Sequence, residues 1–497
     1  MSIHKSMTTR RNFIKKASVA GTGLFLANKM SIASKHFGAV SDVTVNNSII
    51  SNRTREVNIR LTDKQGKPLQ QKIVQVELLK HDFLFGDCNP SMDSMYRQGA
   101  AAAEKLKIYR KVFSSVLNAV NATCYWTERP RNNMAKTEEF QGEYQLEGFN
   151  ETVDWGLANG LSVKGHPLFW TVPKAIPDWL LRYDYQTQLK FLEVRLRSIV
   201  GRYRGRVCQW DSINEMLWEP ALKNLAQRTW PYTETFDNMV DYISFVLRIC
   251  REEDPDTQFL INDYGLERNH NQPAQLRSND NDSSVIEKNK LYDQHHQEVT
   301  AMRQRERYLE LVKRLCDKGF QPAAIGMQGH SGAVTTEEQL ALYDQMATSG
   351  LPLHITEFWA HKEDFGSEFA KLDEEEKQER IAAYVVQYMK NAFGHPSINC
   401  IFFWGFMGMA TQFREGFSTS YTEYPLLNAV RNLIKKEWHT KEILQTNGDG
   451  MITFRGFYGD YSLRYNPIQE QTFSMAEKFR IDRLSGMPLS IQTAIIK

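Results

Sequence analysis

Eight short β-rich runs, each followed by a polar or glycine-containing segment and usually a helical pattern, set the strongest limit on how this chain folds. The runs occupy residues 83–86, 116–120, 161–165, 207–211, 258–262, 324–327, 353–356 and 400–404. Helical patterns intervene, for example at 102–118, 185–204, 235–252, 301–318 and 375–393. Strands that alternate with helices in this way favour an α/β fold, a parallel (β/α)₈ barrel of the TIM type, with a doubly wound open sheet as the alternative.

The two ends of the chain carry a different pattern. Residues 57–61 and 73–78 alternate between polar and apolar and are separated by a turn sequence at 63–68, which predicts a β-hairpin. A similar segment lies at 451–463, so both ends are expected to form one small β-sheet packed on the barrel. The predicted organisation is therefore an N-terminal β-segment at 41–82, the barrel at 83–438 and a C-terminal β-segment at 439–497.

Residues 1–40 have the layout of an export signal and linker. Arg10 and Arg11 precede Phe13 and a lysine pair, an apolar stretch follows at 17–27, and small residues lie near 31–33. The arginine pair resembles a twin-arginine signal, and the apolar stretch is too short to span a bilayer. Export to the periplasm or the cell exterior is expected, with a disordered basic tail as the alternative.

Charge and cysteine usage narrow the classes of partner. The chain has 61 basic and 59 acidic residues, so a general affinity for nucleic acid or anionic membranes is not expected. The six cysteines form no CxxC or other metal-like spacing, and they are expected to be structural without an obligatory disulfide framework. The adjacent His295 and His296, in a polar loop at 268–300, are expected to be solvated rather than metal ligands. Neither a metal nor a nucleotide cofactor is indicated, and the oligomeric state stays open.

Polar and aromatic side chains gather just past the predicted strand ends, where side chains of a barrel converge on one site. They are His166, Trp170, Asn214, Glu215, Asn262, Gln328, His330, Glu357 and Trp404. Glu215 follows the fourth strand and Glu357 ends the seventh, which suggests paired acid/base chemistry such as glycosidic bond cleavage. Retention needs carboxyl groups about 5–5.5 Å apart and inversion about 6.5–9.5 Å, a distance that the residues alone leave open. A weaker alternative is an esterase using Ser331, whose surroundings loosely match a nucleophile elbow.

Six ordered motifs then become recognisable. They are Lys-Gly-His-Pro-Leu-Phe-Trp at 164–170, Trp-Asp-Ser-Ile-Asn-Glu at 210–215, Ile-Asn-Asp-Tyr at 261–264, Gly-Met-Gln-Gly-His at 326–330, Ile-Thr-Glu at 355–357 and Phe-Trp-Gly at 403–405. Together they resemble glycoside hydrolase family 10, whose known members are mostly β-1,4-xylanases. The resemblance spans about residues 83–436 and implies a retaining endo-β-glycosidase.

The resemblance also implies roles for single residues. Glu357 would be the nucleophile that forms a glycosyl-enzyme intermediate, and His330 would orient it. Glu215 would be the acid/base, with a pKa raised in part by the ionised Glu357, and Asn214 would contact the sugar 2-hydroxyl. The remaining sugar contacts would be His166, Trp170, Asn262, Tyr264, Gln328 and Trp404.

Several positions depart from the family pattern. An ungapped match puts Thr123 and Cys124 where members usually carry a Glu-Asn pair that holds the neighbouring xylose. Thr171 stands where a second histidine is expected, Trp359 where an aspartate is expected, and the usual second cleft tryptophan is not evident at 408–413. We therefore expect xylan or a related or substituted β-1,4-glycan as substrate. The alternative is a non-catalytic carbohydrate-binding protein on a glycosidase scaffold.

Overall fold

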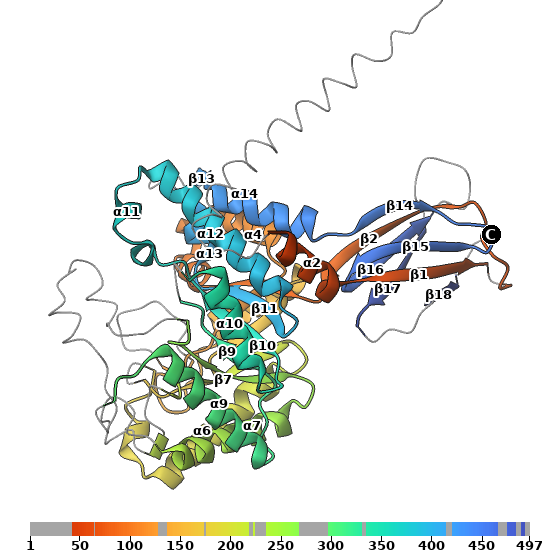
Figure 1. The fold of residues 1–497 in the computed structure, drawn as a ribbon. Helices are drawn as coiled ribbons and strands as arrows, with labels where there is room; N and C mark the ends of the chain where they lie inside the picture. The colour runs from red at the N-terminus through yellow and green to blue at the C-terminus, as the bar shows by residue number, and fades with distance from the viewer. Residues whose placement is uncertain are drawn as a thin grey trace, which may run out of the picture.

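The computed structural model shows an eight-stranded parallel barrel with a β-rich module attached (Figure 1). It describes residues 42–63, 65–127, 137–172, 175–217, 222–223, 235–267, 297–330, 334–413, 420–465, 475–483 and 489–492. The predicted export signal, residues 268–296 with both neighbouring histidines, and Ser331 lie outside the described residues. None of the described helices is both long and apolar enough to cross a membrane.

The barrel strands follow one another around the ring in chain order. They are β3 (Leu84–Cys88), β4 (Ala119–Thr123), β5 (Ser162–His166), β7 (Gln209–Asn214), β8 (Gln258–Asp263), β9 (Ile325–Met327), β10 (Leu353–Phe358) and β11 (Ile398–Phe403). Strand β11 pairs in parallel with β3, and β5 pairs with β7, so the ring closes. A short strand, β6 (Phe169–Trp170), lies beside the end of β7. The predicted (β/α)₈ barrel is confirmed, and the open doubly wound sheet is wrong because no barrel strand is left as an edge.

Helices cover the outside of the barrel. The long ones are α4 (Ala103–Val116), α5 (Glu147–Ala158), α6 (Tyr185–Arg202), α7 (Phe236–Glu253), α9 (Ala301–Asp317), α10 (Thr336–Ala347) and α12 (Glu374–Gly394). Shorter ones are α3 (Pro90–Arg97), α11 (Ser367–Ala370), α13 (Phe406–Ala410) and α14 (Pro425–Asn432). Side-chain caps such as Thr335, which forms a reciprocal capping box with Glu338, set where these helices begin. The strand expected at 116–120 is displaced, because Val116 belongs to the buried face of α4 and the strand starts at Ala119.

The two ends of the chain build two sheets that share one core. One sheet has the order β15 (Met451–Phe457), β1 (Thr54–Thr62), β18 (Leu489–Gln492), and the other has the order β14 (Lys441–Gln445), β2 (Ile73–His81), β16 (Gly459–Tyr465), β17 (Met475–Ile481). A separate two-stranded pair, β12 (Thr411–Phe413) and β13 (Tyr421–Glu423), belongs to the barrel loops. The predicted hairpin of 57–61 with 73–78 is wrong: β1 and β2 lie in different sheets, because their apolar faces cover a common core that includes Val57, Val76 and Tyr461.

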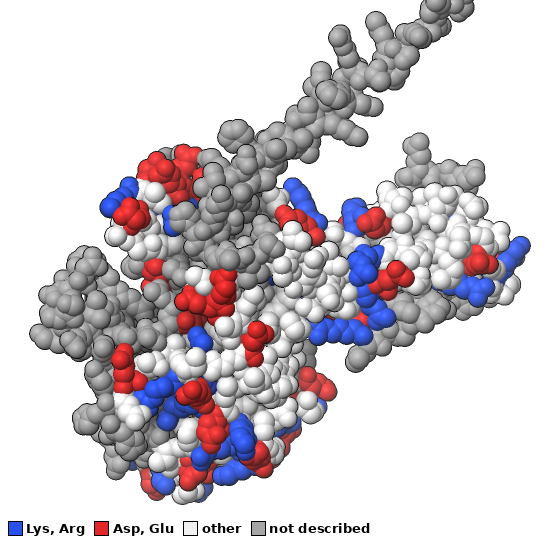
Figure 2. Space-filling model, in the orientation of Figure 1, with Lys and Arg blue, Asp and Glu red and all other residues white. Residues whose placement is uncertain are grey.

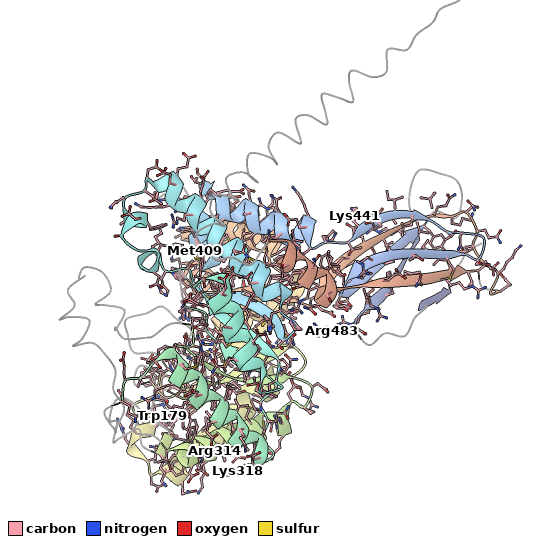
Figure 3. All side chains as sticks on the ribbon, viewed as in Figure 1. Trp179, Arg314, Lys318, Met409, Lys441 and Arg483 are labelled. Atoms are coloured by element: carbon pink, nitrogen blue, oxygen red, sulfur yellow. The ribbon has the colours of Figure 1, made fainter. Side chains whose placement is uncertain are left out.

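A helix that the sequence pattern did not predict joins this module to the barrel. Helix α2 (Asp42–Arg53) packs on the end of α12, and its last residue, Arg53, is buried. The Arg53 guanidinium donates to the carbonyls of Phe393, His395 and Ile398. Arg483, labelled in Figure 3, donates to the carbonyl of Pro396 at the same junction. The module is therefore tied to the end of the barrel where the strands begin, away from the carboxyl ends of the strands.

Acidic and basic side chains are interspersed over the lower barrel helices in Figure 2, whereas acidic side chains predominate near α11. Arg197 illustrates the pattern, since it pairs with Glu193, Glu252 and Glu253. All six cysteines are free, as expected. Within the described ranges, no group of three or more His, Cys, Asp or Glu side chains could hold a metal ion.

Candidate active site

Strand β7 contains a β-bulge just before Glu215, and β10 contains one in the stretch that includes Glu357. The register of β7 against β8 shifts between Asp211 and Ile213, and that of β10 against β11 shifts between Ile355 and Phe358. A bulge adds one residue to a strand and re-aims the side chains that follow it. After the bulge in β10, Phe358 points outward and stacks on Tyr388 of α12 with ring centroids 3.9 Å apart. Its neighbour Glu357 consequently points into the barrel mouth.

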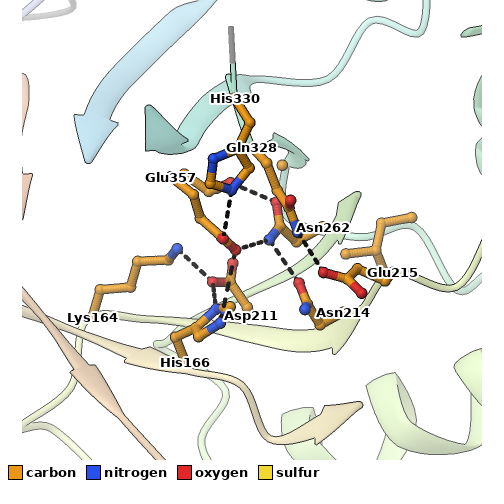
Figure 4. A network of polar contacts seen from close by, with 12 residues as sticks. Lys164, His166, Asp211, Asn214, Glu215, Asn262, Gln328, His330 and Glu357 are labelled. Atoms are coloured by element: carbon orange, nitrogen blue, oxygen red, sulfur yellow. Dashed lines mark hydrogen bonds and ion pairs between the residues drawn. The ribbon is translucent and has the colours of Figure 1, made fainter. Parts of the chain in front are cut away.

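Glu215 lies directly after β7 in a left-handed backbone conformation. Its φ is 60°, and its N–H donates to the Asn262 carbonyl at 2.8 Å. Such a conformation costs a non-glycine residue of order 1–3 kcal/mol and persists where surrounding contacts hold it. The Glu215 carboxylate accepts from Trp170 Nε1 at 2.8 Å. It also accepts from Gln328 Nε2 at 3.1 Å (Figure 4). Both of these donors are uncharged side-chain N–H groups.

Glu357 lies in a different electrostatic setting. Its Oε1 accepts from Asn262 Nδ2 at 2.9 Å and lies 3.7 Å from His166 Nε2, while its Oε2 lies 3.2 Å from His330 Nε2. Burial raises the pKa of this carboxyl, but the charge of His166 and the hydrogen bond from His330 outweigh it, so the pKa lies below its ordinary value. Glu357 is therefore suited to be ionised, as a nucleophile must be.

A buried ion pair orients one of these histidines. Asp211 Oδ2 lies 2.7 Å from His166 Nδ1 and 2.5 Å from Lys164 Nζ, and the side chains of Lys164 and Asp211 are completely buried. Burial raises the pKa of Asp211, but Lys164 and His166 together outweigh this, so the pKa is lowered. With Nδ1 of His166 held by a carboxylate, its Nε2 is directed toward Glu357 (Figure 4).

Asn262 links the parts of the site. Its Nδ2 donates both to Asn214 Oδ1 at 2.8 Å and to Glu357, and its Oδ1 accepts from Thr356 Oγ1 at 2.5 Å. Predicted as a sugar contact, Asn262 is fully buried and has its amide engaged by the protein. In this structure its part is to position Asn214 and Glu357 relative to each other.

Aromatic side chains surround the two carboxylates. The Trp404 ring meets His166 edge-on with centroids 5.2 Å apart, and Tyr125 lies 5.7 Å from Trp170. Trp404 and Trp170 are half-buried, as is Tyr264, which follows β8 and packs partly against the hydrophobic core. All ten residues predicted from the sequence thus lie at the carboxyl ends of the strands.

Sequence reasoning missed Lys164, Asp211, Thr356 and Tyr125. Lys164 precedes His166 by two residues in β5, so the two side chains point to the same, inward side of the strand. This spacing could have predicted that Lys164 belongs to the site. Asp211 precedes Asn214 by three residues, and only the bulge in β7 makes both point inward.

Two of the positions that depart from the family pattern, Thr123 and Cys124, lie in the protein interior. Thr123 is fully buried, and its N–H and hydroxyl both bond to Asn89 Oδ1, at 3.0 and 3.2 Å. Cys124 is also fully buried, and its carbonyl accepts from Arg195 Nη2 at 2.7 Å. Polar contacts from these two side chains to a sugar are therefore absent from the described site.

The sequence profile described as "Glycosyl hydrolase family 10" matches residues 96–279 and 283–439. The chain belongs to glycosyl hydrolase family 10. The expectation of a family 10 glycoside hydrolase is confirmed at the level of the family.

Individual relatives are distant. The chain is 24% identical over 415 residues to the anti-sigma-I factor RsgI6 of Acetivibrio thermocellus, covering 83% of this chain and 45% of that protein. It is 21% identical over 434 residues to endo-1,4-beta-xylanase 1 of Arabidopsis thaliana, covering 87% of this chain and 38% of that protein. The chain thus spans less than half the length of these relatives. Among solved structures, native xylanase 10B from Thermotoga maritima aligns at 19% identity with a TM-score of 0.49, over 72% of this chain and 96% of that one.

Proposed function

We propose that this chain is a retaining endo-β-glycosidase that hydrolyses a β-1,4-linked polysaccharide, with Glu357 as nucleophile and Glu215 as acid/base. The observation that carries the proposal is that one site holds two carboxylates, one of which, Glu357, has a lowered pKa. Glu357 is held by an amide and two histidines and has a lowered pKa, and Glu215 accepts hydrogen bonds from Trp170 and Gln328 in the same site. Two carboxyl groups with different environments are what a glycosidase needs for its two roles.

The chemistry proceeds in two steps. In the first, a Glu357 oxygen attacks the anomeric carbon, the glycosidic C–O bond breaks, and the Glu215 proton passes to the leaving oxygen. In the second, Glu215 removes a proton from water, the water oxygen attacks the anomeric carbon, and the bond to Glu357 breaks. The double use of Asn262 Nδ2 holds Asn214 beside Glu357, where it can reach the sugar hydroxyl next to the reacting carbon.

The polysaccharide is proposed to be xylan or a related or substituted β-1,4-glycan. Xylanase names among the relatives support xylan as the first choice. The interior roles of Thr123 and Cys124 support weak binding of an unsubstituted neighbouring xylose. Reducing-sugar release across a panel of plain xylan, substituted xylans and other β-glycans tests this. High activity on plain xylan would contradict the altered specificity and leave the mechanism intact.

The mechanism is tested by the stereochemistry of the first product. NMR of the early hydrolysate should show the β-anomer, and a 2-deoxy-2-fluoro glycoside with a good leaving group should add its sugar to Glu357, seen by peptide mass spectrometry. An α-anomer as first product would overturn retention. Absence of turnover on every activated glycoside, together with measurable oligosaccharide binding, would favour the carbohydrate-binding alternative.

We also propose export by the twin-arginine route, supported by Arg10 and Arg11 and the short apolar stretch at 17–27. Replacing both arginines by lysine should retain a folded reporter, fused after residue 40, in the cytoplasm. Unchanged export of the lysine variant would contradict the proposal.

A further inference from the structure

Trp359 stands out among the tryptophans of the described residues. Trp126, Trp155, Trp179, Trp210 and Trp438 lie in or against the main hydrophobic core, and Trp170, Trp359 and Trp404 stand outside it. Trp170 bonds Glu215 and Trp404 packs on His166, so two of these three already belong to the site. Trp359 is half-buried, and core packing does not account for its large apolar ring.

Strand geometry directs Trp359 to the same side as the nucleophile. Phe358 points outward onto Tyr388, so its two neighbours, Glu357 and Trp359, both point toward the barrel mouth. Residues two apart in a strand are displaced by roughly 6.6 Å along it, comparable to the length of one sugar residue. The backbone of Trp359 is paired with that of His330, which keeps this extended geometry past the end of β10.

A glycine provides the seat for the indole ring. Gly405 has φ +109°, and a Cβ added there would lie 2.3 Å from Trp359 Cζ3, so the ring rests where any other residue would place a side chain. The turn itself is anchored: buried Asp87 accepts from the N–H groups of Gly405 and Phe406 at 2.8 and 2.9 Å. The Trp359 ring is therefore positioned before any ligand arrives, which reduces the entropy lost on binding.

Aromatic rings connect this seat to the nucleophile. The Trp359 and His361 rings have centroids 6.2 Å apart, and the His361 and His330 rings 5.8 Å. His330 in turn bonds Glu357. On the other side, Trp404 immediately precedes Gly405, so the two tryptophans flank one glycine at the ends of β10 and β11.

We infer that Trp359 is a stacking platform for a backbone sugar of the polysaccharide next to the one at Glu357, and that it determines specificity without taking part in bond cleavage. The inference rests on the proposed function, since it assigns a subsite of that same cleft. An uncharged, half-exposed indole on a rigid turn suits the apolar C–H face of a pyranose ring. It would take over part of the binding that Thr123 and Cys124 do not provide.

Substrate length separates this role from a structural one. Trp359→Ala should lower kcat/KM about five- to ten-fold on oligosaccharides that extend past the catalytic subsite. On an aryl monosaccharide, kcat/KM of Trp359→Ala should stay within about two-fold of that of the unmutated protein. On the long substrates, kcat/KM of Trp359→Phe should lie between those of Trp359→Ala and the unmutated protein. Trp155→Ala on α5, which removes an equally large ring far from the site, is the matched control and should not alter the dependence on length. Equal losses on short and long substrates, or no loss on either, would overturn the platform.

A binding measurement keeps this inference distinct from the proposed function. Calorimetry with the same oligosaccharides, on Glu357→Gln with and without Trp359→Ala, reports affinity without turnover. If the unmutated protein hydrolyses nothing, weaker binding by the double variant than by Glu357→Gln would support the platform and contradict the glycosidase. Normal hydrolysis with equal affinities would contradict the platform alone, and no binding of any panel member would contradict both.

Discussion

Replacing Asn262 by alanine removes the amide that links Asn214 to the nucleophile. The variant deletes a hydrogen bond of 2.9 Å to Glu357 Oε1 and one of 2.8 Å to Asn214 Oδ1. A hydrogen bond to a charged group contributes about 1.5–3 kcal/mol. If the bond to Glu357 is fully formed in the transition state, its loss corresponds to a fall in kcat/KM of about 10- to 150-fold. Loss of a donor to the carboxylate also raises the pKa of Glu357, so the acid limb of the pH profile should move to higher pH.

The assay is kcat/KM on an activated aryl β-glycoside between acidic and neutral pH, with circular dichroism to confirm folding. Thr356→Val is the matched control, because it removes the bond of Thr356 Oγ1 to Asn262 Oδ1 and leaves both donations from Nδ2 in place. In the Thr356→Val control, kcat/KM should fall about two- to ten-fold, which is the effect expected from losing a hydrogen bond between neutral groups. A variant at Asn262 with near-normal kcat/KM and an unmoved acid limb would refute the positioning role, as would a control that is equally impaired.

Three further predictions follow from the contacts. Glu357→Ala should abolish turnover, and Glu215→Ala should cost about 10²–10⁴-fold on poor leaving groups and much less on activated aryl glycosides; equal losses on both substrates would contradict the acid role. His330→Ala removes a bond that lowers the pKa of Glu357, so that pKa should rise and the acid limb of kcat/KM should shift upward in a pH titration; a downward shift would contradict it. Arg53→Met should lower the free energy of unfolding, measured by urea denaturation, by about 3 kcal/mol. The control Arg483→Met, at the exposed edge of the same junction, should lower it by about 0.5 kcal/mol. Equal losses of stability in the two variants would show that the hydrogen bonds from Arg53 to the buried carbonyls contribute little.

The sequence by itself determined the barrel and the residues that line its mouth. Strand and helix periodicities can be read from each segment by itself, because they show which of its faces are apolar. Eight repeats of a strand followed by a helix then leave few alternatives to a closed barrel. Polar residues past the strand ends share one rim because all barrel strands are parallel. Glu215 and Glu357 could therefore be assigned to one site without knowing any distance between them.

Tertiary structure alone decided how those residues are used. The bulges in β7 and β10 break the two-residue alternation that sequence reasoning relies on, so inward positions such as Asp211 were not predicted. The terminal strands pair with partners several hundred residues away, which is why β1 and β2 separate into two sheets instead of a hairpin. The seat of Trp359 depends on Gly405 and on Asp87, which are far apart in the chain and meet only because β11 pairs with β3. Contacts between distant segments leave no periodic trace in the chain, and the site's positioning and proposed specificity depend on such contacts.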